Sequence, residues 1–98
     1  MPKSVAEAPA GRERQRIDKW LWHARMVRTR SAAAALAETG RVRVNGVRIT
    51  ASSHVLHAGD VVTLALDRTI RLIEVKGFVE RRGNGESARA LYRDLPRN

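Results

Sequence analysis

The stretch VRVNGVRI, residues 42–49, predicts a β-hairpin. Apolar and polar residues alternate on both sides of Asn45-Gly46, a dipeptide that favours the type I′ turn of a two-residue β-hairpin. The alternation predicts an apolar hairpin face made of four residues: Val42, Val44, Val47 and Ile49.

Two helices are predicted before the hairpin, because the apolar period there is 3.6 instead of 2. In residues 16–25 the apolar positions recur at i, i+3, i+4 and i+7, and form one stripe of Ile17, Trp20, Leu21 and Ala24. The second helix covers residues 31–40. Thr29 is its expected N-cap and Gly40 its expected stop, and its inner stripe consists of Ala33, Leu36 and Ala37.

The rest of the chain returns to strand patterns after a turn at residues 58–60. Residues 61–66 and 70–78 read as two more strands, and a short helix is predicted within 87–95. The expected fold class is therefore α+β, with two packed helices followed by a small antiparallel sheet.

A chain of 98 residues has the length of a single domain. We expect a disordered tail over 1–13, the domain over 14–80 and a basic C-terminal tail over 81–98. The first segment has few large apolar residues, and the pattern fades after residue 80.

Positive charge gathers in the first half of the domain. The chain has 19 Lys and Arg against 10 Asp and Glu, a net charge of +9. Residues 17–48 carry seven basic and two acidic groups, whereas residues 49–80 carry three and four. Sixteen of the 19 cations are Arg, whose planar fork suits phosphate groups. This segregation predicts a nucleic-acid-binding surface on the helices and the hairpin.

The hairpin places Arg43 opposite Arg48, a pairing of like charges that destabilises a sheet. A polyanion lying across the pair would explain it, because phosphate contacts release counterions. The alternative is an exposed pair whose flexible side chains stay apart in water.

Arg28 and Arg30 flank Thr29 at the start of the second helix, where free N–H groups favour anions. The alternative is that both side chains simply point into water.

Trp22 lies off the apolar stripe, near Lys19 and Arg25. It could stack on an unpaired base, or equally pack against another segment of the chain.

Several classes of protein find no support in the sequence. There is no Cys, and the three His residues show no metal-ligand spacing. No nucleophile or phosphate-loop motif and no apolar run of ~20 residues is present. We therefore expect no enzyme activity, metal, cofactor, small-molecule substrate or membrane partner, and a monomer in a reducing cytoplasm.

The sequence resembles the S4-type RNA-binding domain over residues 15–66. The resemblance lies in RIDKWL (16–21), TRS (29–31), GRVRVNG (40–46) and AGD (58–60). Within that family, DKWLW (18–22) and ARALY (88–92) resemble the heat-shock protein 15 group and its short relatives. The resemblance implies two packed helices followed by a bent antiparallel sheet.

The family resemblance also implies a function, which is binding to large ribosomal subunits that retain peptidyl-tRNA on a stalled nascent chain. It places seven residues at RNA-facing positions: Arg16, Lys19, Arg28, Thr29, Arg30, Arg41 and Asn45. Two departures stand out. Ala34 occupies a position that is often basic, and the long basic C-terminal extension of the larger members is missing.

The expected partners are thus large-subunit ribosomal RNA and peptidyl-tRNA. The full set of candidate RNA-binding residues is Arg16, Lys19, Trp22, Arg25, Arg28, Thr29, Arg30, Arg41, Arg43, Asn45 and Arg48. Three alternatives remain at this point: a general RNA- or DNA-binding module, a ribosome assembly factor, and a domain whose basic face meets an acidic protein.

Overall fold

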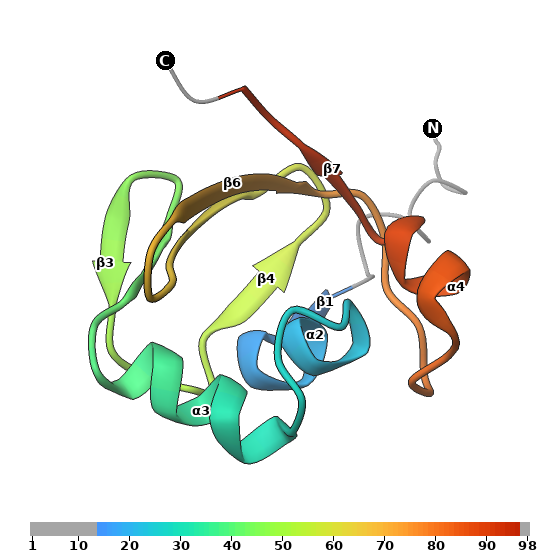
Figure 1. Cartoon of the computed structure of the whole chain (residues 1–98), viewed down its shortest axis with the longest axis horizontal. Helices are drawn as coiled ribbons and strands as arrows, with labels where there is room; N and C mark the ends of the chain where they lie inside the picture. The colour runs from blue at the N-terminus through green and yellow to red at the C-terminus, as the bar shows by residue number, and fades with distance from the viewer. Residues whose placement is uncertain (1–13, 97–98) are drawn as a thin grey trace, which may run out of the picture.

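The computed structural model describes residues 14–96, and the predicted tail over 1–13 lies outside this range (Figure 1). The elements, in chain order, are β1 (Arg14–Arg16), α2 (Ile17–His23), α3 (Arg30–Glu38), β2 (Val42–Val44), β3 (Val47–Ile49), β4 (Val55–His57), β5 (Val61–Ala65), β6 (Ile70–Val75), α4 (Gly85–Arg89) and β7 (Tyr92–Asp94). The predicted α+β class is confirmed. Within residues 14–96, no helix has the length and apolar character needed to cross a membrane.

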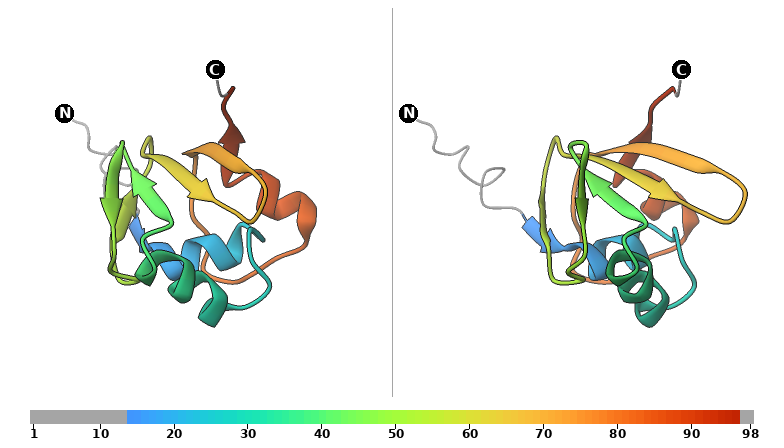
Figure 2. Two further views of the ribbon diagram at one scale, coloured as in Figure 1. Left: turned by 60° about the vertical axis from the view of Figure 1, so that its left-hand side comes forward. Right: turned by 90° about the vertical axis from the view of Figure 1, so that its left-hand side faces the viewer.

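The strands form two antiparallel sheets. The larger has the order β3-β2-β5-β6-β7, and the smaller pairs β1 with β4. The larger sheet curves over the helix pair, and α4 lies beside the start of β7 (Figures 1 and 2). One face of the larger sheet therefore meets the helices, while its other face is turned away from them.

The hairpin of β2 and β3 has the predicted register, with Arg43 opposite Arg48. Asn45 and Gly46 both have positive φ, at 53° and 86°, as a type I′ turn requires. Val47 was expected in the apolar face but is 66% exposed. It pairs with Val44 beside the turn, at the tip of the hairpin, beyond the reach of the helices.

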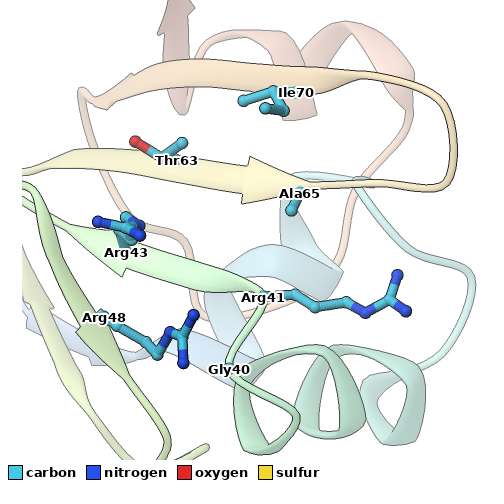
Figure 3. A pocket seen from close by; sticks show the side chains of 7 residues that line it. All are labelled: Gly40, Arg41, Arg43, Arg48, Thr63, Ala65 and Ile70. Carbon is cyan, nitrogen blue, oxygen red and sulfur yellow. The ribbon is translucent and has the colours of Figure 1, made fainter.

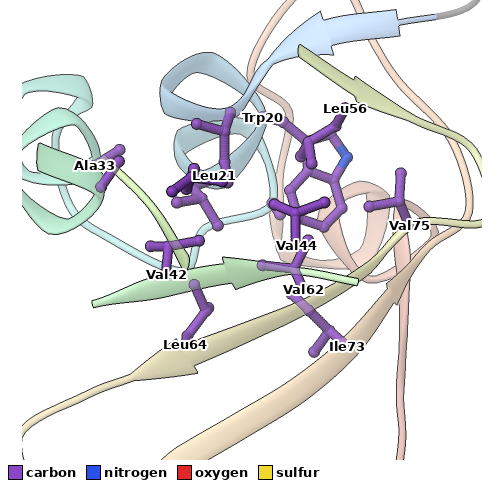
Figure 4. Close-up of a cluster of buried hydrophobic side chains, with 14 of the residues drawn as sticks. Trp20, Leu21, Ala33, Val42, Val44, Leu56, Val62, Leu64, Ile73 and Val75 are labelled. Carbon is purple, nitrogen blue, oxygen red and sulfur yellow. The ribbon is translucent and has the colours of Figure 1, made fainter. Parts of the chain in front are cut away.

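The core lies between the sheet and the two helices, and α2 supplies its largest members (Figure 4). All four residues of the predicted stripe on α2 are buried. Trp20 is fully buried, and its indole Nε1 donates to the carbonyl oxygen of Gly77 at 3.0 Å. On α3 the buried residues are Ala33 and Ala37, whose small side chains bring the helices close together. Leu36 is only partly buried.

The pairing of β1 with β4 was not predicted from the sequence. Val55 to His57 lie in a stretch that reads as irregular, and each strand is only three residues long. The amide of Ile17 continues the contact by donating to the carbonyl of His54 at 2.8 Å. Short strands carry too few alternations to be recognised from sequence, so this pairing becomes visible only in three dimensions.

Residues 81–96, set apart as a tail in the sequence analysis, carry α4 and β7. The predicted helix stops early, because α4 ends at Arg89 and Tyr92 begins a strand. The reason is tertiary: β6 presents an open edge, and the carbonyl of Leu91 accepts from the amides of Lys76 and Gly77. Leu91 itself is 5% exposed and belongs to the core.

Candidate nucleic-acid interface

The first residues of α2 and α3, with the loop between these helices, carry the first group of candidate cations, and the long side chain of Arg30 reaches Asp18 on α2. We call this group the helix-end cluster: Arg16, Lys19, Arg28 and Arg30. Arg16 is the N-cap residue of α2, and Arg30 is the first residue of α3. Arg16, Arg28 and Arg30 are exposed, and Lys19 is half-buried. Four cations on α2, α3 and the segments that precede these helices make a surface suited to phosphate groups.

A buried carboxylate lies beneath this cluster. Asp18 is 4% exposed, and its two oxygens accept from Nε and Nη2 of Arg16 at 3.2 and 2.9 Å. Its Oδ1 atom also accepts from Nη2 of Arg30 at 3.5 Å and from the backbone amide of Lys19 at 2.7 Å. The carboxylate thus connects the two helices through their arginines.

Thr29, expected to face RNA, has a structural contact. As predicted, it caps α3, and its hydroxyl accepts from the amide of Ala32 at 3.0 Å. One lone pair of the hydroxyl oxygen is therefore already used. Because Thr29 is exposed, the remaining lone pair and the hydroxyl hydrogen can still meet a ligand.

The second group of candidate cations lies on the outer face of the sheet, and we call it the sheet-face cluster: Arg41, Arg43 and Arg48. The three side chains surround an open pocket of about 210 Å³ (Figure 3). Gly40, Thr63, Ala65 and Ile70 complete its lining. Within the described residues, the carboxylate nearest to the cluster is that of Asp67, 3.9 Å from Arg41 and itself 98% exposed. The pocket is therefore strongly positive.

Gly40 shapes this pocket. Its backbone φ is 78°, a value that residues with a side chain rarely adopt. A Cβ atom at this position would lie 3.4 Å from Cδ of Arg48. The aliphatic part of the Arg48 side chain thus lies against Gly40, which follows the C-cap residue of α3. Because α3 has nine residues and spans ~13 Å, its N-terminus belongs to the helix-end cluster and its C-terminus adjoins the sheet-face cluster.

Asn45 has its side-chain amide engaged in the fold. Its Oδ1 accepts from the amide of Val61 at 2.9 Å, and its Nδ2 donates to Asp60 at 3.1 Å. These bonds fix the hairpin tip to the turn before β5. The backbone amide of Asn45 also donates to the carbonyl of Val61 at 2.7 Å, so we assign Asn45 to the support of the surface.

Trp22 and Arg25 are fastened to the segment before α4. The guanidinium carbon of Arg82 lies 5.5 Å from the centre of the Trp22 ring, and its Nε donates to the Trp22 carbonyl at 2.9 Å. The Nε atom of Arg25 donates to the carbonyl of Gly83 at 3.2 Å. Of the two alternatives for Trp22, this geometry favours packing, because one ring face already carries a cation.

Sequence reasoning missed two residues that organise this surface. Asp18 was not among the candidate residues, and Arg82 was placed in the C-terminal tail. The RIDK run contained the signal for Asp18, since a carboxylate two residues after an Arg can pair with it. No local signal exists for Arg82, whose partner lies 60 positions away.

Known proteins resemble this chain in sequence. The S4 domain model matches residues 15–62. Heat shock protein 15 of Escherichia coli K12 is 35% identical over 79 residues, which cover 81% of this chain and 59% of that protein. The Haemophilus influenzae homolog is 33% identical over 79 residues, with 81% and 60% covered. The chain thus spans about 60% of the length of these relatives.

The fold also matches a solved structure. The trimeric structure of Vibrio cholerae heat shock protein 15 superposes with a TM-score of 0.79 at 35% identity. The match covers 85% of this chain and 83% of that one. With this identity, this coverage and the S4 match over α2, α3 and the hairpin, the chain belongs to the heat shock protein 15 family and carries an S4-type RNA-binding domain.

Proposed function

We propose that the protein binds structured RNA of the large ribosomal subunit in the bacterial cytoplasm and acts in the rescue of stalled nascent-chain complexes. The observation that carries the proposal is the pair of arginine clusters at the two ends of α3, on an S4 domain. The role is one of binding, with ribosomal RNA as the main partner and peptidyl-tRNA as a second.

The clusters suit folded RNA for electrostatic reasons. Guanidinium groups donate two parallel hydrogen bonds to a phosphate, and each neutralised phosphate releases counterions. Folded RNA is recognised largely through its backbone and its shape, so contacts on two sides of one small domain are appropriate. Arg30 at the helix ends and Arg43 on the sheet face represent the two surfaces.

The test is sedimentation of the tagged protein from a gentle lysate through a sucrose gradient. We expect it to migrate with free large subunits that carry peptidyl-tRNA. Arg30→Ala and Arg43→Ala should each move protein to the top of the gradient without unfolding the domain. Arg89→Ala, which removes an equal charge from exposed α4, is the matched control and should migrate as wild type.

Other outcomes would assign other functions. Migration with immature subunits that lack peptidyl-tRNA indicates an assembly factor. Equal affinity for duplex DNA and ribosomal RNA indicates a general nucleic-acid module. A complex that survives nuclease treatment indicates an acidic protein partner. A protein that stays at the top at low salt contradicts the ribosomal proposal altogether.

We further propose that the binding unit is a monomer, because both clusters lie on one chain. The Vibrio cholerae relative is a trimer in its solved structure, so the trimer is the competing state. Light scattering after gel filtration separates them: a mass near 10.9 kDa supports the monomer, and three times that mass contradicts it.

A further inference from the structure

Asp18 differs from the exposed carboxylates of the chain in its place beneath the arginines of the helix-end cluster. Only 5% of its side chain is exposed, compared with 49% for Arg16 and 44% for Arg30. The negative charge is thus covered, and the two guanidinium groups above it face the solvent. A ligand that approaches this surface meets the arginines before it meets the carboxylate.

The hydrogen bonds fix both arginines relative to one point. Arg16 makes a two-bond contact with the carboxylate through Nε and Nη2, and Arg30 reaches Oδ1 from the neighbouring helix. A guanidinium has five N–H donors, so Arg16 keeps three and Arg30 keeps four for another acceptor. The backbone of this segment is held as well, because the amide of Asp18 donates to Ser52 at 3.3 Å.

We infer that Asp18 is a positioning residue that holds Arg16 and Arg30 together as one preformed receptor for a backbone phosphate of RNA. The inference rests on the proposed RNA-binding function and adds a residue to its machinery. Long arginine side chains lose rotamer freedom when they bind, and a pair that is already ordered loses less. The three groups together keep a net positive charge, which suits a phosphodiester.

For Asp18→Asn, a positioning role and simple charge attraction predict opposite changes in RNA affinity. Asp18→Asn raises the net charge by one, so attraction to a polyanion alone would tighten RNA binding. If Asp18 positions the arginines, the same change weakens binding. Asn has a similar shape, and its carbonyl still accepts from the amide of Lys19, while its NH₂ group faces the donors of Arg16 and breaks the two-bond contact.

The first experiment is a titration of a fluorescein-labelled RNA hairpin with wild type, Asp18→Asn and a control. We expect Asp18→Asn to bind about tenfold more weakly, the loss of one charge-assisted contact. Glu86→Gln makes the same charge change at an exposed residue of α4 and should bind as wild type or slightly tighter. Unchanged or tighter binding by a folded Asp18→Asn protein overturns the inference.

A double-variant comparison separates positioning from a purely structural role. In the Arg16→Ala/Arg30→Ala background, Asp18→Asn should leave RNA affinity unchanged or slightly higher, because nothing remains for it to position and only the charge change acts. A further loss of affinity in that background would show that Asp18 acts through the fold as a whole, and would contradict the inference.

The wild-type protein provides a test that requires no folded Asp18 variant. In a ¹⁵N-correlated NMR spectrum, the Nε–H of Arg16 should exchange slowly with water and shift when the RNA hairpin is added. Rapid exchange, as expected for Arg43 on the sheet face, or no shift with RNA, overturns the positioning role. Failure of wild type to bind RNA in any assay would instead contradict the proposed function.

Discussion

At the residue scale, α2 buries two ionisable side chains, and they have different surroundings. Asp18 has arginine partners, whereas His23 is 1% exposed and its Nδ1 has no hydrogen-bond partner within the described residues. Burial lowers the pKa of His23 below its ordinary value of 6.5. Lys19, Arg30 and Arg82 lower it further, while the Val79 carbonyl acts in the opposite direction. The neutral imidazole is therefore the form that the fold accommodates.

The first prediction concerns pH. Because the pKa of His23 is lower in the folded state, the unfolded chain binds more protons in acid. The contribution of His23 to stability should be complete above pH 6.5 and should diminish as the pH falls through 6.5 towards the lowered pKa. Urea melts at pH 7.5 and 5 would measure it. His23→Gln should show a smaller difference between the two, and an equal difference would assign the effect to other groups.

The sequence predicts the role of an exposed charged residue better than the role of a residue that contacts a distant part of the chain. The exposure of Arg28, Arg43 and Arg48 follows from their place on helix and hairpin patterns, and so does the cap at Thr29. The fastening of Trp22 does not, because it depends on Arg82, which approaches only after the whole sheet has formed.

At the element scale, the junction of α4 and β7 is where local preference and tertiary contact disagree. Ala, Arg, Leu and Tyr in residues 88–92 satisfy a helix pattern, and the first two residues follow it. The chain then leaves the helix because Tyr92 can pair with Val75 on β6. Strand pairing with a distant edge outweighs a helix propensity of a few tenths of a kcal/mol per residue.

The second prediction follows from this junction. Leu91→Ala should lower the free energy of unfolding by about 2–5 kcal/mol, because Leu91 is a buried core side chain. Arg93→Ala, two positions further on, loses only an exposed ion pair with Glu74 at 3.1 Å and should change stability by less than about 1 kcal/mol. Denaturant melts compare them, and equal effects would contradict the assignment of β7 to the sheet.

At the scale of the whole molecule, the fold separates charge from core. The sequence divides the domain into a basic first half and a near-neutral second half. In the structure, the arginines of the first half lie at both ends of α3 and on the outer face of the sheet. The sequence could place the charge on elements. The pocket between Gly40 and Ile70 could not be anticipated, because it joins β2, β3, β5 and β6.

The third prediction concerns the two clusters together. Arg30 and Arg43 have no common partner and lie towards opposite ends of α3, so their effects on RNA affinity should add. The double variant Arg30→Ala/Arg43→Ala should also reduce the slope of log affinity against log salt by about two, one for each lost phosphate contact. RNA titrations at several KCl concentrations measure both quantities. A double variant no weaker than either single one would indicate that RNA uses one cluster only.

The long reach of the core has a consequence for synthesis of the chain. Ile17 and Trp20 pack in the same buried cluster as Leu91, and Trp20 is tied to Gly77. During translation the two helices therefore emerge long before the residues that cover them. The core stays incomplete until the residues of β7 have left the exit tunnel, so the arginine-rich helices and hairpin pass ribosomal RNA before their core is closed.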